Sequence, residues 1–291
     1  MAEALLVQRL ANKPAFIGGT QRVNAGYSGP ILRVHDGTTT KDVGSLAQAA
    51  SFFGAHAGTV DILYDQSGNG RDFPFNLARP LLWDGSAFYR AGSSLSIPGM
   101  RFTAAQDFMR ASDACGLSGT SALTHFHLAK VGTTGNNQFA VWGDENALGS
   151  TPAAVGLSFV YALGGGQDDC RWAVSTTPTS TSDRRTNGAS NCAAAKSQHY
   201  SVVTWPGGAV SADNATWRIN GTAQSVGDTT AGQTVTRANP NWSNNGARIA
   251  SRPGNSALFN GDITMVGFWL VALSGTDLST LERFAERWRI Q

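Results

Sequence analysis

The stretch GDITMVGFWLVALSGTDLSTLERFAERWRI (261–290) decides the fold, because a long apolar run is followed at once by an amphipathic pattern. Gly261–Leu273 is rich in β-branched and aromatic residues and predicts a buried strand. The polar residues 274–277 supply capping groups for a helix that begins at about Leu278. Five apolar residues share one face of that helix: Leu278, Leu281, Phe284, Ala285 and Trp288. We expect this short C-terminal helix to cover an edge or rim of a β-sheet.

Composition extends the β prediction to the rest of the 291 residues. The chain has 34 Gly and only four Glu and four Lys, and the last two are good helix formers. Gly, Asn, Ser and Thr separate short apolar runs at intervals of about 8–12 residues, which is typical of sandwiches and barrels. Thr124–Val131 alternates as a strand, and Asn220-Gly221 is a strong hairpin signal. We therefore predict an all-β sandwich.

The sequence predicts one sandwich core. Its expected members lie at apolar positions of the predicted strands: Ile31, Leu63, Phe126, Leu128, Phe159, Val202, Ile263, Val266 and Phe268. No linker divides residues 21–291, so we expect them to form a single domain. Residues 1–20 are expected to be a separate lead-in, whose apolar side chains at Leu5, Leu6, Leu10 and Phe16 dock on a partner chain. The alternative is that this segment folds back on its own sandwich.

Charge and hydropathy exclude several classes of partner. The net charge is +2 and the arginines are scattered, so nucleic-acid binding gains no support. No apolar run approaches the ~20 residues of a membrane-spanning helix, and residues 1–13 do not resemble a secretory signal. Three cysteines, Cys115, Cys170 and Cys192, are expected to be reduced thiols of a protein made in the cytoplasm. A Cys170–Cys192 bridge is the alternative.

Two segments carry a family resemblance. YSGPILRVHDGTTTKDVG (27–44) and VDILYDQSGNGRDF (60–73) resemble the opening of the catalytic β-sandwich of arabinofuranosidase B-type enzymes. Similar openings occur in laminin-G-like modules of bacteriophage structural proteins. The closing residues 259–284 also resemble the last strand and helix of laminin-G-like domains. The resemblance implies a concanavalin A-like jelly roll with a short C-terminal helix.

The same resemblance suggests a catalytic site that is incomplete. Glycoside hydrolysis uses two carboxyl groups. In WGDENALG (142–149), Glu145 takes the position of the family's nucleophile, and Asn146 that of a substrate contact. The position of the general acid holds Gly254, which cannot protonate a leaving group. We therefore predict no catalysis, and a glycoside hydrolase that uses Glu145 is the alternative.

Aromatic and polar residues in two loops predict a carbohydrate-binding site. Indole faces stack on sugar rings, while carboxylates and amides accept hydrogen bonds from sugar hydroxyls. We expect the loops 143–152 and 164–170 to meet at one rim of the sandwich. The candidate binding residues are Trp142, Asp144, Glu145, Asn146, Asp168, Asp169 and Trp172.

Two further constellations have simpler interpretations than a metal site, and no cofactor is expected. His125 and His127 lie on one face of a strand, and we interpret them as a packed or hydrogen-bonded pair. Asp65, Asn69 and Asp72 carry oxygens that calcium could use. We instead predict that Tyr64–Gly70 is a structural turn, in which Asp65 accepts backbone hydrogen bonds.

The sequence thus predicts a non-catalytic protein that binds cell-surface polysaccharide. We expect it to be the spike or fibre component of a phage or phage-like particle, made in the bacterial cytoplasm and released by lysis. We also expect a homo-oligomer that contacts other particle proteins through residues 2–20. A structural decoration protein of a virion is a further alternative.

Overall fold

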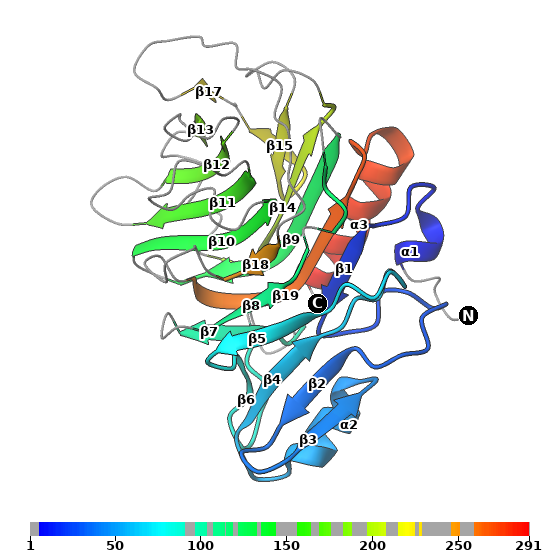
Figure 1. Ribbon diagram of the computed structural model, residues 1–291, viewed down its shortest axis with the longest axis vertical. Coiled ribbons are helices and arrows are strands. Elements are labelled where there is room, and N and C mark those ends of the chain that lie inside the picture. Colours follow the sequence, from blue (N-terminus) through cyan, green and yellow to red (C-terminus); the bar gives the residue numbers. More distant parts are fainter. Residues whose placement is uncertain are drawn as a thin grey trace.

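The computed structural model describes residues 6–90, 97–103, 107–113, 115–118, 122–132, 135–143, 156–163, 169–175, 183–187, 197–207, 215–224, 227–228, 246–250 and 259–290. Strands dominate these ranges, and three helices accompany them: α1 (Leu6–Arg9), α2 (Leu46–Phe53) and α3 (Gly275–Ile290). The 19 strands of the described ranges form one continuous sheet that folds over into two layers (Figure 1). The all-β sandwich with a C-terminal helix is therefore confirmed.

The first layer is built around the strand that the sequence identified most clearly. β19 (Asn260–Trp269) pairs antiparallel with β1 (Phe16–Gly19), β7 (Met100–Thr103) and β9 (Leu123–Val131). The layer continues from β9 in the following order: β14 (His199–Trp205), β15 (Thr216–Ile219) and β16 (Thr222–Gln224). At the other side it continues into the N-terminal strands β2 (Leu32–His35), β3 (Thr40–Val43), β4 (Gly58–Leu63) and β6 (Leu81–Trp83).

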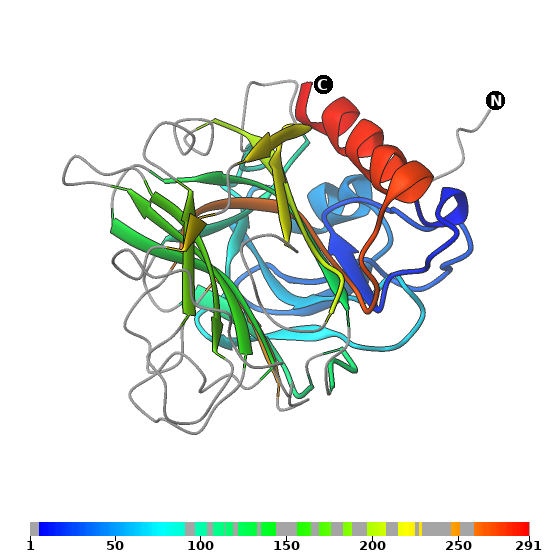
Figure 2. The same ribbon diagram turned by 90° about the horizontal axis from the view of Figure 1, so that it is seen from above.

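The second layer is an antiparallel sheet reached through β5 (Phe73–Leu77), which pairs with β4 on one side and with β8 on the other. Its strands follow in this order: β8 (Asp107–Ala111), β18 (Ala247–Ile249), β10 (Gly135–Gly143), β11 (Gly156–Leu163), β12 (Asp169–Ser175), β13 (Asp183–Asn187) and β17 (Gly227–Asp228). Viewed from above, α3 lies outside the first layer, on the side away from β10–β12 (Figure 2).

Both faces of the central strands of the first layer, β9, β14 and β19, are buried, which divides the apolar interior in two. Five of the predicted core residues join the large cluster of the sandwich: Ile31, Leu63, Ile263, Val266 and Phe268. Phe126, Leu128 and Val202 are also buried, but they pack with Leu281, Ala285 and Trp288 of α3 in a second cluster. The prediction of one core is wrong for these three residues, because α3 covers the face that they share. The side chain of Phe159 is outside the described part.

The N-terminal segment is part of the domain, so the expected boundary at residue 20 is wrong. β1 pairs with β19 from Phe16↔Phe268 to Gly19↔Met265, and Phe16 is fully buried. Leu6, Val7 and Leu10 pack in the cluster beneath α3. Asp277 of α3 accepts hydrogen bonds from the backbone N–H groups of Ala11 (2.9 Å) and Asn12 (2.8 Å). These apolar side chains are buried in their own chain, so they are not available to a partner.

The free energy of unfolding tests this assignment. Phe16→Ala should destabilise the monomer by about 3–5 kcal/mol, because it empties a fully buried position between β19 and Phe73. Phe52→Ala, at a half-buried position of α2, is the matched control and should cost clearly less. The measurement is urea denaturation of both variants and the unmodified chain. An unchanged midpoint for Phe16→Ala would instead favour the prediction that residues 1–20 dock on a partner chain.

Candidate functional site

Three of the seven candidate carbohydrate contacts lie in described strands. Trp142 is in β10, and Asp169 and Trp172 are in β12. Trp142 pairs with Leu157 of β11, and Trp172 pairs with Phe159 of the same strand. The other four, Asp144, Glu145, Asn146 and Asp168, lie outside the described residues, as does Gly254.

Strand register corrects the expectation that the two loops meet at one rim. β10 and β11 are joined from Gly143 to Gly156, which pair with each other at one end of β11. β11 and β12 are joined from Leu163 to Asp169, at the opposite end. The eight residues of β11 separate these two ends by roughly 23 Å. Successive hairpins of an antiparallel meander turn at opposite ends, so the predicted set divides into two.

The turn that follows β4 is the best-defined polar site in the described part of the chain. The Asp65 carboxylate is 1% exposed. Its Oδ1 accepts hydrogen bonds from the backbone N–H of Ile17 (3.2 Å) and Ser67 (2.8 Å). Its Oδ2 accepts from the Ser67 hydroxyl (2.7 Å) and the Arg71 backbone N–H (3.2 Å). Four donors therefore surround one buried carboxylate.

Gln66 connects the same turn to the segment that follows β1. Its Oε1 accepts from the backbone N–H of Val23 (2.8 Å), and its Nε2 donates to the Gln21 carbonyl (3.0 Å). Its own carbonyl accepts from Nδ2 of Asn24 (2.7 Å). Gly68 and Gly70 adopt φ of +93° and +69°, a region that glycine enters without steric cost. These contacts support the predicted structural role of the turn.

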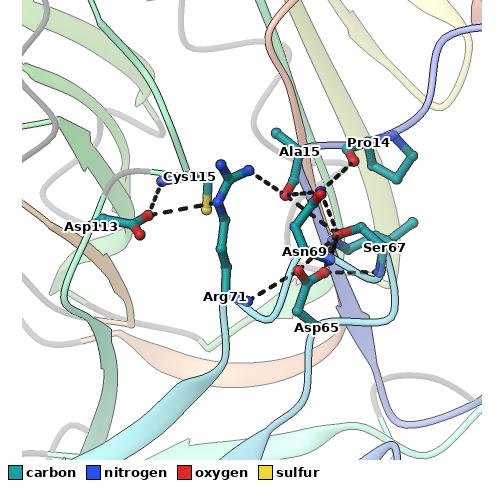
Figure 3. A network of polar contacts seen from close by, with 9 residues as sticks. Pro14, Ala15, Asp65, Ser67, Asn69, Arg71, Asp113 and Cys115 are labelled. Atoms are coloured by element: carbon teal, nitrogen blue, oxygen red, sulfur yellow. Dashed lines mark hydrogen bonds and ion pairs between the residues drawn. The ribbon is translucent and has the colours of Figure 1, made fainter. Parts of the chain in front are cut away.

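The polar residues of the turn are committed to this scaffold. Hydrogen-bond donors face both oxygens of Asp65, and Oδ1 of Asp72 accepts from the Asp65 N–H (2.9 Å). Nδ2 of Asn69 donates to the Ala15 carbonyl (3.0 Å) (Figure 3). A calcium ion needs oxygens where this turn places N–H groups. Among the described residues, no group of three or more His, Cys, Asp or Glu side chains is placed to hold a metal.

A cavity of about 350 Å³ lies beside this turn. Its lining joins residues that are far apart in the sequence: Asn12, Lys13, Pro14, Ala15, Asn69, Arg71, Leu270 and Val271. Figure 3 shows the Arg71 side chain between Ala15 on one side and Asp113 on the other. Nη1 of Arg71 donates to the Ala15 carbonyl (2.9 Å), and its Nε lies 3.9 Å from Oδ1 of Asp113. The sequence did not reveal this cavity, because three separate segments build it.

Three buried histidines line the inner face of the first layer. Nε2 of His125 lies 2.9 Å from Nδ1 of His127, which confirms the predicted hydrogen-bonded pair. The His127 and His199 rings are in edge contact, with centroids 5.6 Å apart. Burial lowers the pKa of His125 and of His127 well below the usual value, and burial lowers the pKa of His199 to about 4. The folded chain therefore keeps all three rings neutral at neutral pH.

Acid should lower the free energy of unfolding over a pH range that is set by the pKa values of these histidines. The unfolded chain binds a proton on each histidine near pH 6.5, whereas the folded chain does not, so stability is complete above that pH and falls below it. Between pH 7.5 and 5.5 the free energy of unfolding should drop by about 1.4 kcal/mol per histidine. Urea denaturation at the two pH values measures this. Equal midpoints would show that the rings take up protons to the same extent in the folded and unfolded chains, which would contradict the lowered pKa values.

Removal of the Asp65 carboxylate tests the scaffold. Asp65→Ala leaves buried N–H donors without an acceptor and should cost about 1–3 kcal/mol of stability. Ser67→Ala removes one donor to the carboxylate and is the matched control, with a smaller loss. Denaturant unfolding provides the measurement. If Asp65→Ala unfolds like the unmodified chain but no longer binds glycan, then the turn belongs to a binding site.

The side chain of one of the three cysteines lies in the described part of the chain. Cys115 is a buried free thiol, and burial raises its pKa. The side chain of Cys170 and all of Cys192 lie outside the described part.

No helix in the described ranges has both the length and the apolar composition to cross a membrane.

Comparison with known proteins supports the fold. No family model matches the chain, and no curated protein matches it. Among solved structures, the chain is similar to an arabinofuranosidase complexed with arabinofuranosyl-α-1,2-xylobiose, with a TM-score of 0.66 and 13% identity over 98% of this chain. A GH54 α-L-arabinofuranosidase soaked with 4-nitrophenyl α-L-arabinofuranoside gives 0.64 and 15% over 95%. The chain spans 64% and 63% of those two proteins, slightly under two thirds of their length.

Proposed function

We propose that the chain binds a polysaccharide without cleaving it. The observation that carries the proposal is the shared sandwich: 98% of the chain superposes on part of an arabinofuranosidase that was solved with an arabinose-containing oligosaccharide. A sandwich of this kind offers strand ends and loops on a rigid framework, and sites on such frameworks are common places for ligands.

Gly254 at the position of the family's general acid favours binding over hydrolysis. In α3, Glu282 forms an ion pair with Arg218 and Glu286 forms one with Arg289, so both have structural partners. Glu145 is the glutamate that matches the family's nucleophile, and the position of the acid holds Gly254. A glycosidase uses both an acid and a nucleophile, and the resemblance supplies the nucleophile position alone. The shared fold keeps an arabinofuranosidase-type hydrolase that uses Glu145 as the second candidate.

We further propose that the chain acts on the surface of a phage or phage-like particle and binds cell-surface polysaccharide there. The similarity of 27–44 and 60–73 to modules of phage structural proteins supports this location. A single sugar site of this kind binds weakly, near the millimolar range, or about −4 kcal/mol. Many copies on one particle raise the overall affinity by about 10²–10⁴. Weak single sites therefore suit attachment by an assembly.

Two tryptophan variants test the binding surface. Trp172→Ala should reduce glycan binding far more than it reduces stability, because an indole face contributes stacking to a sugar ring. Trp142→Ala is the matched comparison, since Trp142 lies at the Gly143 end of the sheet and Trp172 lies within β12. Binding to a glycan array and the urea midpoint are measured for both. Loss in only one variant would assign the site to that part of the second layer.

Prolonged incubation of the array glycans with the protein distinguishes binding from cleavage. We expect no release of reducing sugar, and Glu145→Gln should leave binding almost unchanged. Release of sugar that Glu145→Gln abolishes would establish the hydrolase instead. A blank array, with a folded protein, would contradict carbohydrate binding and favour a structural decoration protein.

A further inference from the structure

The cavity beside the Asp65 turn has two positively charged residues in its lining. Lys13 and Arg71 both line it, and its eight described lining residues include no aspartate or glutamate. Two carboxylates lie next to Arg71 outside the lining: Asp113 forms a long ion pair with it, with 3.9 Å between Oδ1 and Nε, and Asp65 accepts a hydrogen bond from its backbone N–H. The carboxylate of Asp277 accepts three hydrogen bonds from Ala11 and Asn12, and it also interacts electrostatically with Lys13. The residues that line the cavity themselves carry only positive charge, which favours a negative group there.

The two cations keep donors for a ligand after their internal contacts are made. Arg71 uses Nη1 for the Ala15 carbonyl, and a guanidinium carries five N–H donors. Nζ of Lys13 donates to the carbonyls of Val7 (2.8 Å) and Leu10, and an ammonium carries three donors. These internal contacts also hold both side chains in place, so a ligand orders them at little further cost in entropy.

The rest of the lining suits a sugar better than a bare ion. Leu270 and Val271 are half-buried and contribute apolar surface, as do Pro14 and Ala15. Nδ2 of Asn69 is held by the Ala15 carbonyl, which orients the amide and leaves its Oδ1 as a potential acceptor for a hydroxyl. The volume of about 350 Å³ falls within the range of small-molecule sites.

We propose that this cavity binds the acidic sugar of a polysaccharide, with the carboxylate of a uronic acid on Arg71 and Lys13 and the sugar ring against Leu270 and Val271. Arginine forms paired, charge-assisted hydrogen bonds to a carboxylate, and these are stronger than neutral ones. The inference rests on the proposed function and adds to it a second site, which is specific for an acidic sugar. It places the site at the N-terminal side of the first layer, apart from the tryptophans of β10 and β12.

A pair of ligands that differ only in the acid tests the proposal. Methyl β-D-glucuronide and methyl β-D-glucoside are titrated into the full chain at low salt, and binding is followed by NMR chemical-shift changes. We expect the glucuronide to bind at least about tenfold more tightly, because a hydrogen bond to a charged group is worth more than a neutral one. The difference should shrink as salt is added. Equal binding of the two sugars would overturn the proposal.

Charge variants locate the bound acid. Arg71→Gln and Lys13→Gln each remove one positive charge from the lining, and each should weaken glucuronide binding by about tenfold. Arg33→Gln is the matched control, because it removes the same charge from β2, outside the lining, and it should bind like the unmodified chain. If Arg71→Gln does not fold, glucuronide binding by Lys13→Gln alone tests whether the cavity holds the acid. Glucuronide binding that survives in a folded variant, or an equal loss in Arg33→Gln, would contradict the site.

Sodium sulfate, titrated alone, separates a sugar site from a simple anion site. Competition by sulfate at the concentration of the glucuronide would indicate an anion site only and would overturn the sugar assignment. The glycan array keeps this result distinct from the proposed function. An array that binds neutral glycans alone would refute the acidic-sugar site and leave carbohydrate binding standing, whereas a blank array would refute both.

Discussion

The buried carboxylate of Asp65 joins the N-terminal segment to the rest of the sandwich. Through Ile17 it holds β1, and β1 in turn extends the first layer beside β19. The backbone N–H of Gln66 donates to the Ile17 carbonyl (2.8 Å), so Ile17 is bonded on both its N–H and its carbonyl by this turn. A charge removed from water costs several kcal/mol unless donors surround it, and here four donors do. This strong local requirement fixes where the chain enters the sheet.

The sequence predicted those parts of the fold in which local chemistry and burial agree. The Asp65 turn and α3 were predictable, because the turn glycines and the helical apolar face lie within short windows, although α3 begins at Gly275 and not at about Leu278. β1 was not predictable, since Phe16-Ile17-Gly18-Gly19 is short and ends in two glycines, which is typical of a turn. Its strand conformation depends on pairing with Met265–Phe268, about 250 residues away in the chain. Long-range pairing of this kind leaves no local signal.

Burial of both faces of the central strands β9, β14 and β19 also explains the errors in the predicted core. Alternation in β9 separates two groups correctly, with His125 and His127 on one face and Phe126 and Leu128 on the other. The apolar group was assigned to the sandwich interior, yet it faces α3, and the imidazoles face inward. The alternation along the strand therefore showed which residues share a face, but not which of the two faces points into the sandwich. The prediction for the two loops was wrong for a different reason: one loop enters β11 and the other leaves it, so chain order already places them at opposite ends of this strand.

The cavity beside the Asp65 turn follows from the same contacts that hold β1. Ala15 donates its N–H to the Phe268 carbonyl (2.8 Å), while its own carbonyl receives Arg71 and Asn69. The side chains that line the cavity are thus fixed by the scaffold before any ligand binds, and a preorganised site loses little entropy on binding. A ligand that binds the folded chain alone stabilises it by mass action. Binding in this cavity and docking of the N-terminal segment are therefore coupled, because Lys13 and Ala15 belong to both.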